Sequence, residues 1–379
     1  MRWVGVRSPG LTLSGGWGER GQTAGMRVVV APDVWRGSSG ALDVAGVVGR
    51  VAVDAGWECV ELPVTDGGEG TLEVFGGPNR TTQVTGPLGD PVDAGWRLNG
   101  RTAIVEMARA SGLDLVGGPE GNDPVAASTV GTGELLSKAL ELGARRLLVG
   151  LGGSATTDGG LGALRALYPL QRLRGLDLIV MCDVRTSFVD AAEVFAPQKG
   201  ASAAQVELLR RRLQRLAEVY LEDHGVDVLT MVGAGAAGGL AGGLAAAGGT
   251  LMGGFDAIAD EMGLPDAVED ADLVITAESF LDEQSFDGKV VGGVAELAAA
   301  LGVPCLAIVG EAVELKAEDM VSDVETGAAG AISPEARRGL RVVSLVERFG
   351  RERAEGAPVA CIEEIAAEAL ATGPEALRT

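Results

Sequence analysis

The sequence predicts an α/β protein of two domains, and three observations lead to that prediction. Short β-branched runs alternate with amphipathic segments over most of the chain, which is typical of helices layered on largely parallel sheets. Most apolar runs end in a polar or glycine-rich loop, where open α/β sheets place their ligands. The chain has 379 residues, and because one domain usually holds only ~150, we expect a second hydrophobic core.

The expected strands follow one another as short apolar runs. RVVVAPD at 27–33 precedes a helix expected near 40–55, and WECVEL at 57–62 is the next strand. Further buried strands are expected at 145–151, 176–184, 271–277 and 303–310.

The segment 84–108 departs from this alternation. It contains three strand-like runs, joined by a PLGDP turn and by an Asn99-Gly100 turn, and the second is a strong hairpin signal. Antiparallel strands within an α/β chain indicate an inserted domain. We therefore predict one domain from 26–80 together with 271–379, and a second α/β domain from 81–270.

The N-terminal residues 1–25 show neither helical nor strand periodicity and contain no apolar segment typical of a signal peptide. Because a strand is expected directly after Met26, we interpret 1–25 as disordered or as an artefact of the assigned start. The uncharged stretch 228–255 is mostly glycine and alanine, so it does not predict a membrane span. We expect a cytoplasmic protein without a membrane partner.

Composition excludes several partners and chemistries. The 53 acidic residues outnumber the 31 basic ones, and the net charge of −22 would repel nucleic acid. The four cysteines are far apart without CxxC spacing, so we interpret them as reduced core residues. With His224 as the single histidine, a His-rich zinc site is excluded and a general base is expected to be a carboxylate.

Glycine-rich loops are the first candidates for a ligand site, because the 59 glycines are about twice the usual ~7 % share. TDGGEGT at 65–71 and GLGGSATTDGG at 150–160 each follow an expected strand and precede a helix. Such loops let backbone N–H groups approach a phosphate, while Asp66 and Asp158 could hold Mg²⁺ or a substrate hydroxyl. A tight turn with an aspartate N-cap explains either motif alone about equally well. Two such motifs in one chain favour a phosphate site.

A rival motif keeps a second class of protein open. GAGAAGG at 233–239 matches GxGxxG after an expected strand at 226–232, so a nicotinamide-dependent oxidoreductase is one alternative. The following segment 248–256 is broken by glycines and is a poor candidate for the strand that should come next. Gly288-Lys289 is followed by valine, so the chain has no Walker A motif.

Two polar segments add further candidates. VFAPQKGAS at 194–202 places Lys199 before a long expected helix, where it is a candidate phosphate contact or simply a solvated lysine. The segment 274–289 leaves a buried strand and presents carboxylates that suit either a metal or a surface loop. The polar residues of that segment are Glu278, Asp282, Gln284 and Lys289.

The order of these blocks resembles that of the bacterial type I glycerate kinase family. The resemblance implies a Rossmann-like three-layer α/β domain built from both ends of the chain, with a second α/β domain inserted. It also implies a kinase that uses ATP and Mg²⁺ to phosphorylate D-glycerate to phosphoglycerate. The matching blocks are APDVWRGSSGALDVA at 31–45, LPVTDGGEGT at 62–71, GLGGSATTDGG at 150–160, CDV with VFAPQKGA at 182–201, GAGAAGG at 233–239, ADLVITAESFLDEQ at 271–284 and SLVERFG at 344–350.

The resemblance also implies roles for individual residues. Asp66, Asp158 and Asp183 are expected to be catalytic, with Asp66 or Asp158 orienting the attacking hydroxyl or carrying Mg²⁺. Arg36 is expected to bind the carboxylate of the acid. Further contacts to ATP or the acid are expected from Asp33, Ser38, Gly67, Gly68, Glu69, Gly152, Gly153, Ser154, Gln198, Lys199, Gly235, Gly238, Glu278, Asp282, Gln284 and Lys289.

Several departures from the family pattern leave a second alternative. Arg36 stands where the family usually has lysine, and TGEGRLDSQT appears as TAESFLDEQS at 276–285, so that Phe280 replaces an arginine. An Asn-Pro after CDV is missing, and the segment at 167–176 is shorter than the family norm. A non-catalytic paralogue with a binding or regulatory role therefore stays open. So do the phosphorylated hydroxyl, the preferred acid and whether the protein is a homodimer.

Overall fold

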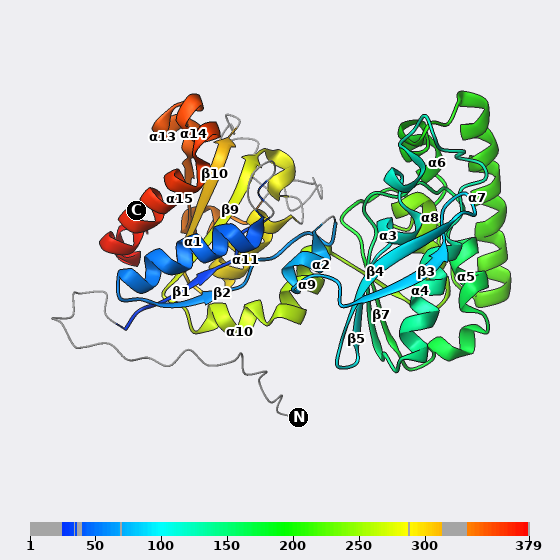
Figure 1. Ribbon diagram of the computed structural model, residues 1–379, viewed down its shortest axis with the longest axis horizontal. Helices are drawn as coiled ribbons and strands as arrows, with labels where there is room; N and C mark the ends of the chain where they lie inside the picture. Colours follow the sequence, from blue (N-terminus) through cyan, green and yellow to red (C-terminus); the bar gives the residue numbers. More distant parts are fainter. Residues whose placement is uncertain are drawn as a thin grey trace.

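The computed structural model describes residues 25–33, 35, 40–68, 70–286, 289–312 and 332–377. Two sheets lie side by side, with short helices between them (Figure 1). The predicted α/β fold with parallel and antiparallel strands is confirmed. No helix within these residues is long and apolar enough to cross a membrane.

The first sheet has five parallel strands in the order β11-β10-β9-β1-β2. Strand β1 lies between β9 and β2, so segments from both ends of the chain meet at the centre of the sheet. Its residues alternate between two cores, Val28 and Val30 facing one and Val29 the other, because successive side chains of a strand point to opposite faces. The strands are β1 (Arg27–Val30), β2 (Glu58–Glu61), β9 (Leu273–Leu281), β10 (Cys305–Ala312) and β11 (Leu340–Ser344).

Helices cover both faces of the first sheet, as the three-layer prediction requires. On one face α1 and α15 share a core with Val28, and on the other α9, α10 and α11 pack around Val29. Helix α12 packs beside β10 and α11, whereas α13 and α14 add Leu345 and Ala354 to the core that α1 and α15 share. The bounds are α1 (Ala41–Asp54), α9 (Gly254–Met262), α10 (Leu264–Glu269), α11 (Val290–Ala300), α12 (Pro334–Gly339), α13 (Leu345–Phe349), α14 (Arg351–Gly356) and α15 (Pro358–Thr372), with short 3-10 turns η4 (Glu283–Phe286) and η5 (Pro374–Leu377).

The second sheet has six strands in the order β3-β4-β5-β6-β7-β8. Strands β3, β4 and β5 pair antiparallel, which confirms the hairpins predicted at 84–108, and the other pairs are parallel. Its carboxyl ends at β5, β6 and β7 therefore share one edge, the edge that carries the loops discussed below. The strands are β3 (Arg80–Thr85), β4 (Pro91–Asn99), β5 (Thr102–Glu106), β6 (Arg146–Gly150), β7 (Asp177–Met181) and β8 (Thr250–Met252).

One face of the second sheet packs on its own helices and the other faces the first half of the molecule. Helices α4, α5 and α8 cover one face, and α7 with α6 forms an outer layer. On the other face Ile104 and Ile179 share a core with Val29 and Phe255, so a single apolar cluster joins the two halves. The helices are α2 (Thr71–Val74), α3 (Ala108–Ser111), α4 (Val130–Glu141), α5 (Leu161–Leu167), α6 (Ala191–Phe195), α7 (Ala203–His224) and α8 (Ala236–Ala246), with η1 (Asp114–Val116), η2 (Leu170–Leu173) and η3 (Pro197–Lys199).

Two strand predictions were wrong. The segment 226–232 forms turns, because Asp227 accepts the N–H of Leu229 and starts a tight turn there. The segment 248–256, a poor strand candidate because of its glycines, contributes β8 at the sheet edge, where three residues suffice for pairing with β7.

All four cysteines are free thiols, as predicted, although only Cys305 and Cys361 are buried. The domain boundaries near 80 and 270 stay a prediction.

Candidate functional site

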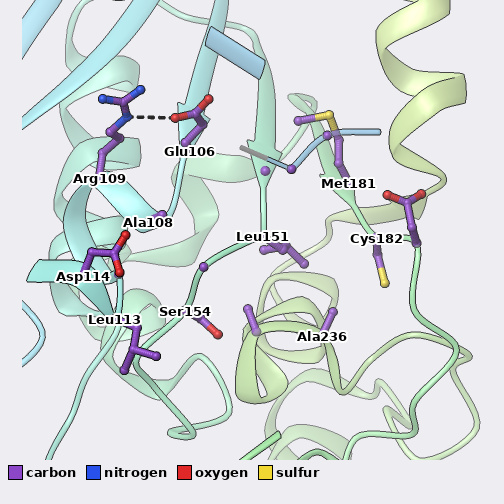
Figure 2. A pocket seen from close by; sticks show the side chains of 18 of the residues that line it. Glu106, Ala108, Arg109, Leu113, Asp114, Leu151, Ser154, Met181, Cys182 and Ala236 are labelled. Carbon is purple, nitrogen blue, oxygen red and sulfur yellow. Dashed lines mark hydrogen bonds and ion pairs between the residues drawn. The ribbon is translucent and has the colours of Figure 1, made fainter. Parts of the chain in front are cut away.

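A cavity of ≈ 1120 Å³ lies between the two halves, at the carboxyl ends of β5, β6 and β7. Its walls come from the loop that follows β2, from the loops that follow β5, β6 and β7, from η3 and from the start of α8. Figure 2 shows Glu106 and Arg109 on one side of this cavity and Met181 and Cys182 on the other. The position agrees with the general rule that open α/β sheets bind ligands at their carboxyl edge.

The first wall is the loop of Asp66, Gly67 and Gly68. Asp66 Oδ1 accepts the N–H of Gly68 at 3.0 Å, and the hydroxyl of Thr71 donates to Gly68 O at 2.8 Å, so the loop makes a tight turn into α2. Gly67 has a φ of +82°, and a Cβ there would lie 2.9 Å from the Cβ of Met181. Only glycine therefore lets this loop lie against the end of β7 and bring Asp66 to the cavity.

The second wall centres on Lys199, whose side chain reaches the glycine loop after β6. Lys199 is 3 % exposed, and its Nζ donates to Ser154 Oγ at 2.8 Å and to Thr156 O at 2.7 Å. Burial lowers the pKa of this ammonium group to about 7, while the charge of Asp158 acts in the opposite direction. Among the residues that the structure describes, none forms an ion pair with Lys199. A buried cation that forms no ion pair within the described residues and lies next to Gly152 and Gly153 suits a phosphate group.

The third wall carries carboxylates. Asp183 follows β7, and its Oδ1 accepts the N–H of Gly254 at 2.7 Å. Burial raises the pKa of Asp183 to about 7; the charges of Asp66 and Asp256 raise it further, whereas the Gly254 N–H and Lys289 lower it. Burial is thus the main reason that the ionised form of Asp183 is disfavoured, and the neighbouring carboxylates add to it.

Glu278 on β9 is another buried carboxylate that the charge of Asp66 affects. Its Oε1 accepts the hydroxyl of Ser285 at 2.7 Å, and its Oε2 is buried without a hydrogen-bond partner in the described chain. Burial raises the pKa of Glu278 to about 7, and the charge of Asp66 contributes in the same direction. Glu278 itself does not line the cavity.

The carboxylates of Asp66 and Asp183 could hold a magnesium ion. Among the described residues, no group of three or more His, Cys, Asp or Glu side chains forms a complete metal cage. Mg²⁺ usually takes one or two protein carboxylates and completes its shell with waters and substrate phosphates. Burial raises the pKa of Asp183 most, and the charge of Asp66 adds to the rise; a divalent cation beside both carboxylates would favour their ionised forms, so the donors fit this ion.

The structure brings many of the predicted site residues together and leaves others outside. Arg36, Ser38 and Glu69, as well as the side chain of Gln284, lie outside the described residues. Asp33, Asp282 and Glu278 do not line the cavity, and Asp282 instead accepts the N–H of Ser285 at the start of η4. The predicted residues that do line it are Asp66, Gly67, Gly68, Gly152, Gly153, Ser154, Asp183, Gln198, Lys199 and Lys289.

Asp158 is placed differently from its predicted role. It does not line the cavity, and its carboxylate accepts the N–H groups of Thr129, Gly160 and Gly162 at 2.9, 3.0 and 3.2 Å. The hydroxyls of Ser128 and Thr129 donate to the same group. These bonds join the N-termini of α4 and α5, so we propose a structural role for Asp158 in place of catalysis or metal binding.

Gly235 and Gly238 also lie outside the cavity lining. A Cβ at Gly235 would be 2.2 Å from Ser187 O, and one at Gly238 would be 2.0 Å from Thr156 O. The glycines of 233–239 therefore permit close backbone packing at the start of α8. Since no strand precedes them, the motif lacks the strand-turn-helix context of a dinucleotide site, and the oxidoreductase alternative loses its basis.

Among the described residues, four charged ones of the cavity wall were missed from the sequence: Asp93, Glu106, Arg109 and Asp114. Glu106 is 5 % exposed at the end of β5, and Arg109 Nε donates to it at 2.8 Å (Figure 2). The sequence contained a signal for Glu106 and Arg109. They lie in the EMAR segment at the end of an expected strand, and polar residues at strand ends mark ligand sites.

Comparison with known proteins agrees with the geometry. The family model described as the glycerate kinase family matches residues 28–168 and 169–338. The glycerate 2-kinase of Escherichia coli is 38% identical over 327 residues, covering 75% of this chain and 85% of the relative. The glycerate kinase of Haemophilus influenzae is 39% identical over 327 residues, covering 75% of this chain and 86% of the relative.

A solved structure extends the comparison to three dimensions. A chain from Salmonella typhimurium LT2, assigned as a glycerate kinase 2, superposes with a TM-score of 0.75 at 33% identity. The match covers 92% of this chain and 98% of that one, so both halves of the fold are shared. These matches confirm the resemblance seen in the sequence, and the chain belongs to the glycerate kinase family.

Proposed function

We propose that the protein is an ATP-dependent kinase that phosphorylates a hydroxyl of D-glycerate, or of a closely related small hydroxy acid, in the cytoplasm. The observation that carries this proposal is one cavity that combines a buried, unpaired Lys199 with the carboxylates of Asp66 and Asp183. Phosphoryl transfer needs cations at the phosphates and a carboxylate at the attacking hydroxyl, and these walls supply both.

Lys199, Ser154 and the amides of Gly152 and Gly153 would bind the phosphates of ATP. The hydrogen-bond partners of Lys199 Nζ, Ser154 Oγ and Thr156 O, are both neutral, so a phosphate oxygen would give the ammonium group an anionic partner. This site contributes electrostatic stabilisation of the charge that is spread over the transferred group.

Asp66 would hold Mg²⁺ together with oxygens of the nucleotide. When bound, the ion neutralises phosphate charge and aligns the transferred group. Asp183, held by the N–H of Gly254, would orient the attacking hydroxyl and accept its proton. Lys289 lies near Asp183 and limits the rise of its pKa, so it would keep part of this carboxylate ionised.

The carboxylate of the acid needs a cation of its own. Arg36, which lies outside the described residues, stays the prediction for this contact. Among the residues that the structure describes, the cations of the cavity wall besides Lys199 are Lys289 and Arg109. Arg109 is paired with Glu106 and Glu73, which leaves it less free to bind an anion.

ADP release with ATP, Mg²⁺ and a panel of acids tests the proposal. The panel is D-glycerate, L-glycerate, glycolate, lactate and tartronate. We expect turnover with D-glycerate, and NMR of the product would show whether the 2- or the 3-hydroxyl is phosphorylated. A folded protein that binds ATP but turns over none of the acids would instead be the non-catalytic paralogue. The altered 276–285 block, with Phe280 45 % exposed, is the observation that favours this second candidate.

A further inference from the structure

Glu106 is a buried carboxylate with two partners from different parts of the fold. Its Oε1 accepts the backbone N–H of Leu72 at 2.8 Å, and its Oε2 accepts Arg109 Nε at 2.8 Å. Leu72 belongs to α2, which follows the Asp66 loop, whereas Arg109 belongs to α3, which follows β5 of the second sheet. Glu106 therefore links the loop that enters the cavity from the first half to the wall supplied by the second.

The bond to Leu72 is a helix cap supplied from outside the helix. The first N–H groups of a helix have no partner within it, and Gly70 at the N-cap position of α2 has no side chain to offer. A carboxylate at this end also interacts favourably with the helix dipole. Because α2 is a single turn, this external cap helps to decide where the loop ends and the helix begins.

The Asp66 loop is held at two other points by close backbone packing. A Cβ at Gly150 would lie 2.6 Å from Gly67 O, and a Cβ at Gly254 would lie 1.7 Å from Asp66 O. These contacts fix the front of the loop against β6 and α9. Glu106 acts on its far end, five residues beyond Gly67 at Leu72.

Arg109 offers an internal comparison. It donates through Nε to Glu106 and through Nη2 to Glu73 Oε1, both at 2.8 Å. The Glu106 side chain is 6 % exposed and the Glu73 side chain 49 %. Both glutamates neutralise the same arginine, but Glu106 alone of the two caps α2.

We propose that Glu106 is a positioning residue that acts through the N-terminus of α2 to hold Asp66 in its place in the cavity. The inference rests on the proposed function, in which Asp66 holds the metal with ATP. Glu106 does not itself touch the reacting groups. Its contribution is the loop geometry, and a misplacement of about 1 Å at a reacting centre can cost ~10²-fold in rate.

Steady-state kinetics on four variants tests the inference. We expect Glu106→Ala to lower kcat by about 10–10²-fold, with the KM for D-glycerate changed less. Glu106→Gln keeps an oxygen for the Leu72 N–H and should recover most of this loss. Glu106→Asp keeps the charge but not the reach, so it should resemble Glu106→Ala. Glu73→Gln, the matched control, should stay near wild type because it leaves the cap intact.

Hydrogen exchange at the Leu72 amide gives a reading that does not require activity. We expect faster exchange in Glu106→Ala and Glu106→Asp, and slow exchange in Glu106→Gln and Glu73→Gln. If wild-type protein turns over no acid, the proposed function fails while exchange still reports on the cap. If Glu106→Ala does not fold, the Asp and Gln variants carry the comparison.

Three results would overturn the inference. The first is unchanged Leu72 exchange in Glu106→Ala and Glu106→Asp. The second is wild-type kcat in these variants although the amide exchanges faster. The third is an equal loss of kcat in Glu106→Gln and Glu73→Gln, which would assign the effect to the charge of Arg109 and not to the cap.

Discussion

Asp183 and Gly254 are joined by a 2.7 Å hydrogen bond that runs from the Gly254 N–H to Asp183 Oδ1. It connects the end of β7 in the second sheet to the first residue of α9, which packs against the first sheet. The positive end of the α9 dipole favours the ionised carboxylate, in opposition to the burial that raises the pKa of Asp183 to about 7. The junction of the two halves therefore orients Asp183 through this hydrogen bond, and burial at the same junction disfavours its ionised form.

We expect Asp183→Asn to stabilise the ligand-free protein at pH 8 and to reduce turnover. The folded pKa of about 7 lies above the unfolded value of ~3.9, so the ionised carboxylate costs stability above pH 7 and none below pH 4. Thermal unfolding should show a Tm increase of roughly 2–4 °C at pH 8 that disappears towards pH 4. The kcat should fall by ~10²–10⁴-fold if Asp183 accepts the proton.

The matched control for this change is Asp90→Asn in an exposed turn, which should alter neither Tm nor kcat. A lower Tm for Asp183→Asn at pH 8 would show that the ionised group is favourable in the folded protein. Full activity of this variant would remove Asp183 from the chemistry.

Replacement of Lys199 should weaken nucleotide binding more than it affects the fold. Lys199→Met removes the buried cation but keeps most of the side-chain volume, so we expect the Kd for ATP to rise by about 10–10²-fold. Isothermal titration calorimetry without the acid measures this directly. Lys138→Met, at a half-exposed lysine on α4, is the control, and an equal effect there would argue against a specific phosphate contact.

Nucleotide affinity should fall as pH rises through 7. Since burial lowers the pKa of Lys199 to about 7, the ammonium form that binds phosphate is lost above this pH, by roughly tenfold per pH unit. Binding at pH 7 should take up about half a proton per site, which calorimetry in two buffers of different ionisation enthalpy detects.

Among the described residues, Asp158 is the one charged group that contributes to the shift of the Lys199 pKa. The Lys199→Arg variant keeps Asp158 and removes the titration of the lysine. Arginine stays charged over this range, and its binding should lose both the pH dependence and the proton uptake. A wild-type Kd that is constant from pH 6 to 9 would contradict the prediction.

Asp158→Ala should damage stability and leave the chemistry of folded protein nearly intact. The change removes the acceptor of three backbone N–H groups at the starts of α4 and α5, and we expect a loss of about 2–4 kcal/mol in the free energy of unfolding. Urea denaturation measures the loss, and kcat is compared under conditions where the variant is folded. An unchanged denaturation midpoint with a large loss of kcat would return Asp158 to the catalytic residues.

Local pattern was sufficient to predict most of the fold. The strands at 27–33, 145–151, 176–184, 271–277 and 303–310 are confirmed because buried parallel strands have a composition that tertiary context does not change. The strand at 57–62 is confirmed as the partly exposed edge strand β2. Strand β8 was missed because a three-residue edge strand carries too little periodicity. The two TDGG motifs look alike in the sequence because both are polar turns that precede a helix.

The sequence by itself determined the α/β class, the family and the candidate loops, because periodicity, glycine clustering and block order are properties of neighbouring residues. Only the tertiary structure decided which aspartate faces the cavity. Asp66 and Asp158 occupy equivalent places in similar motifs. Asp66 lines the cavity between the two halves, whereas the carboxylate of Asp158 accepts N–H groups at the starts of two helices. The role of Glu106 likewise depends on an N–H group 34 residues away, which no local pattern contains.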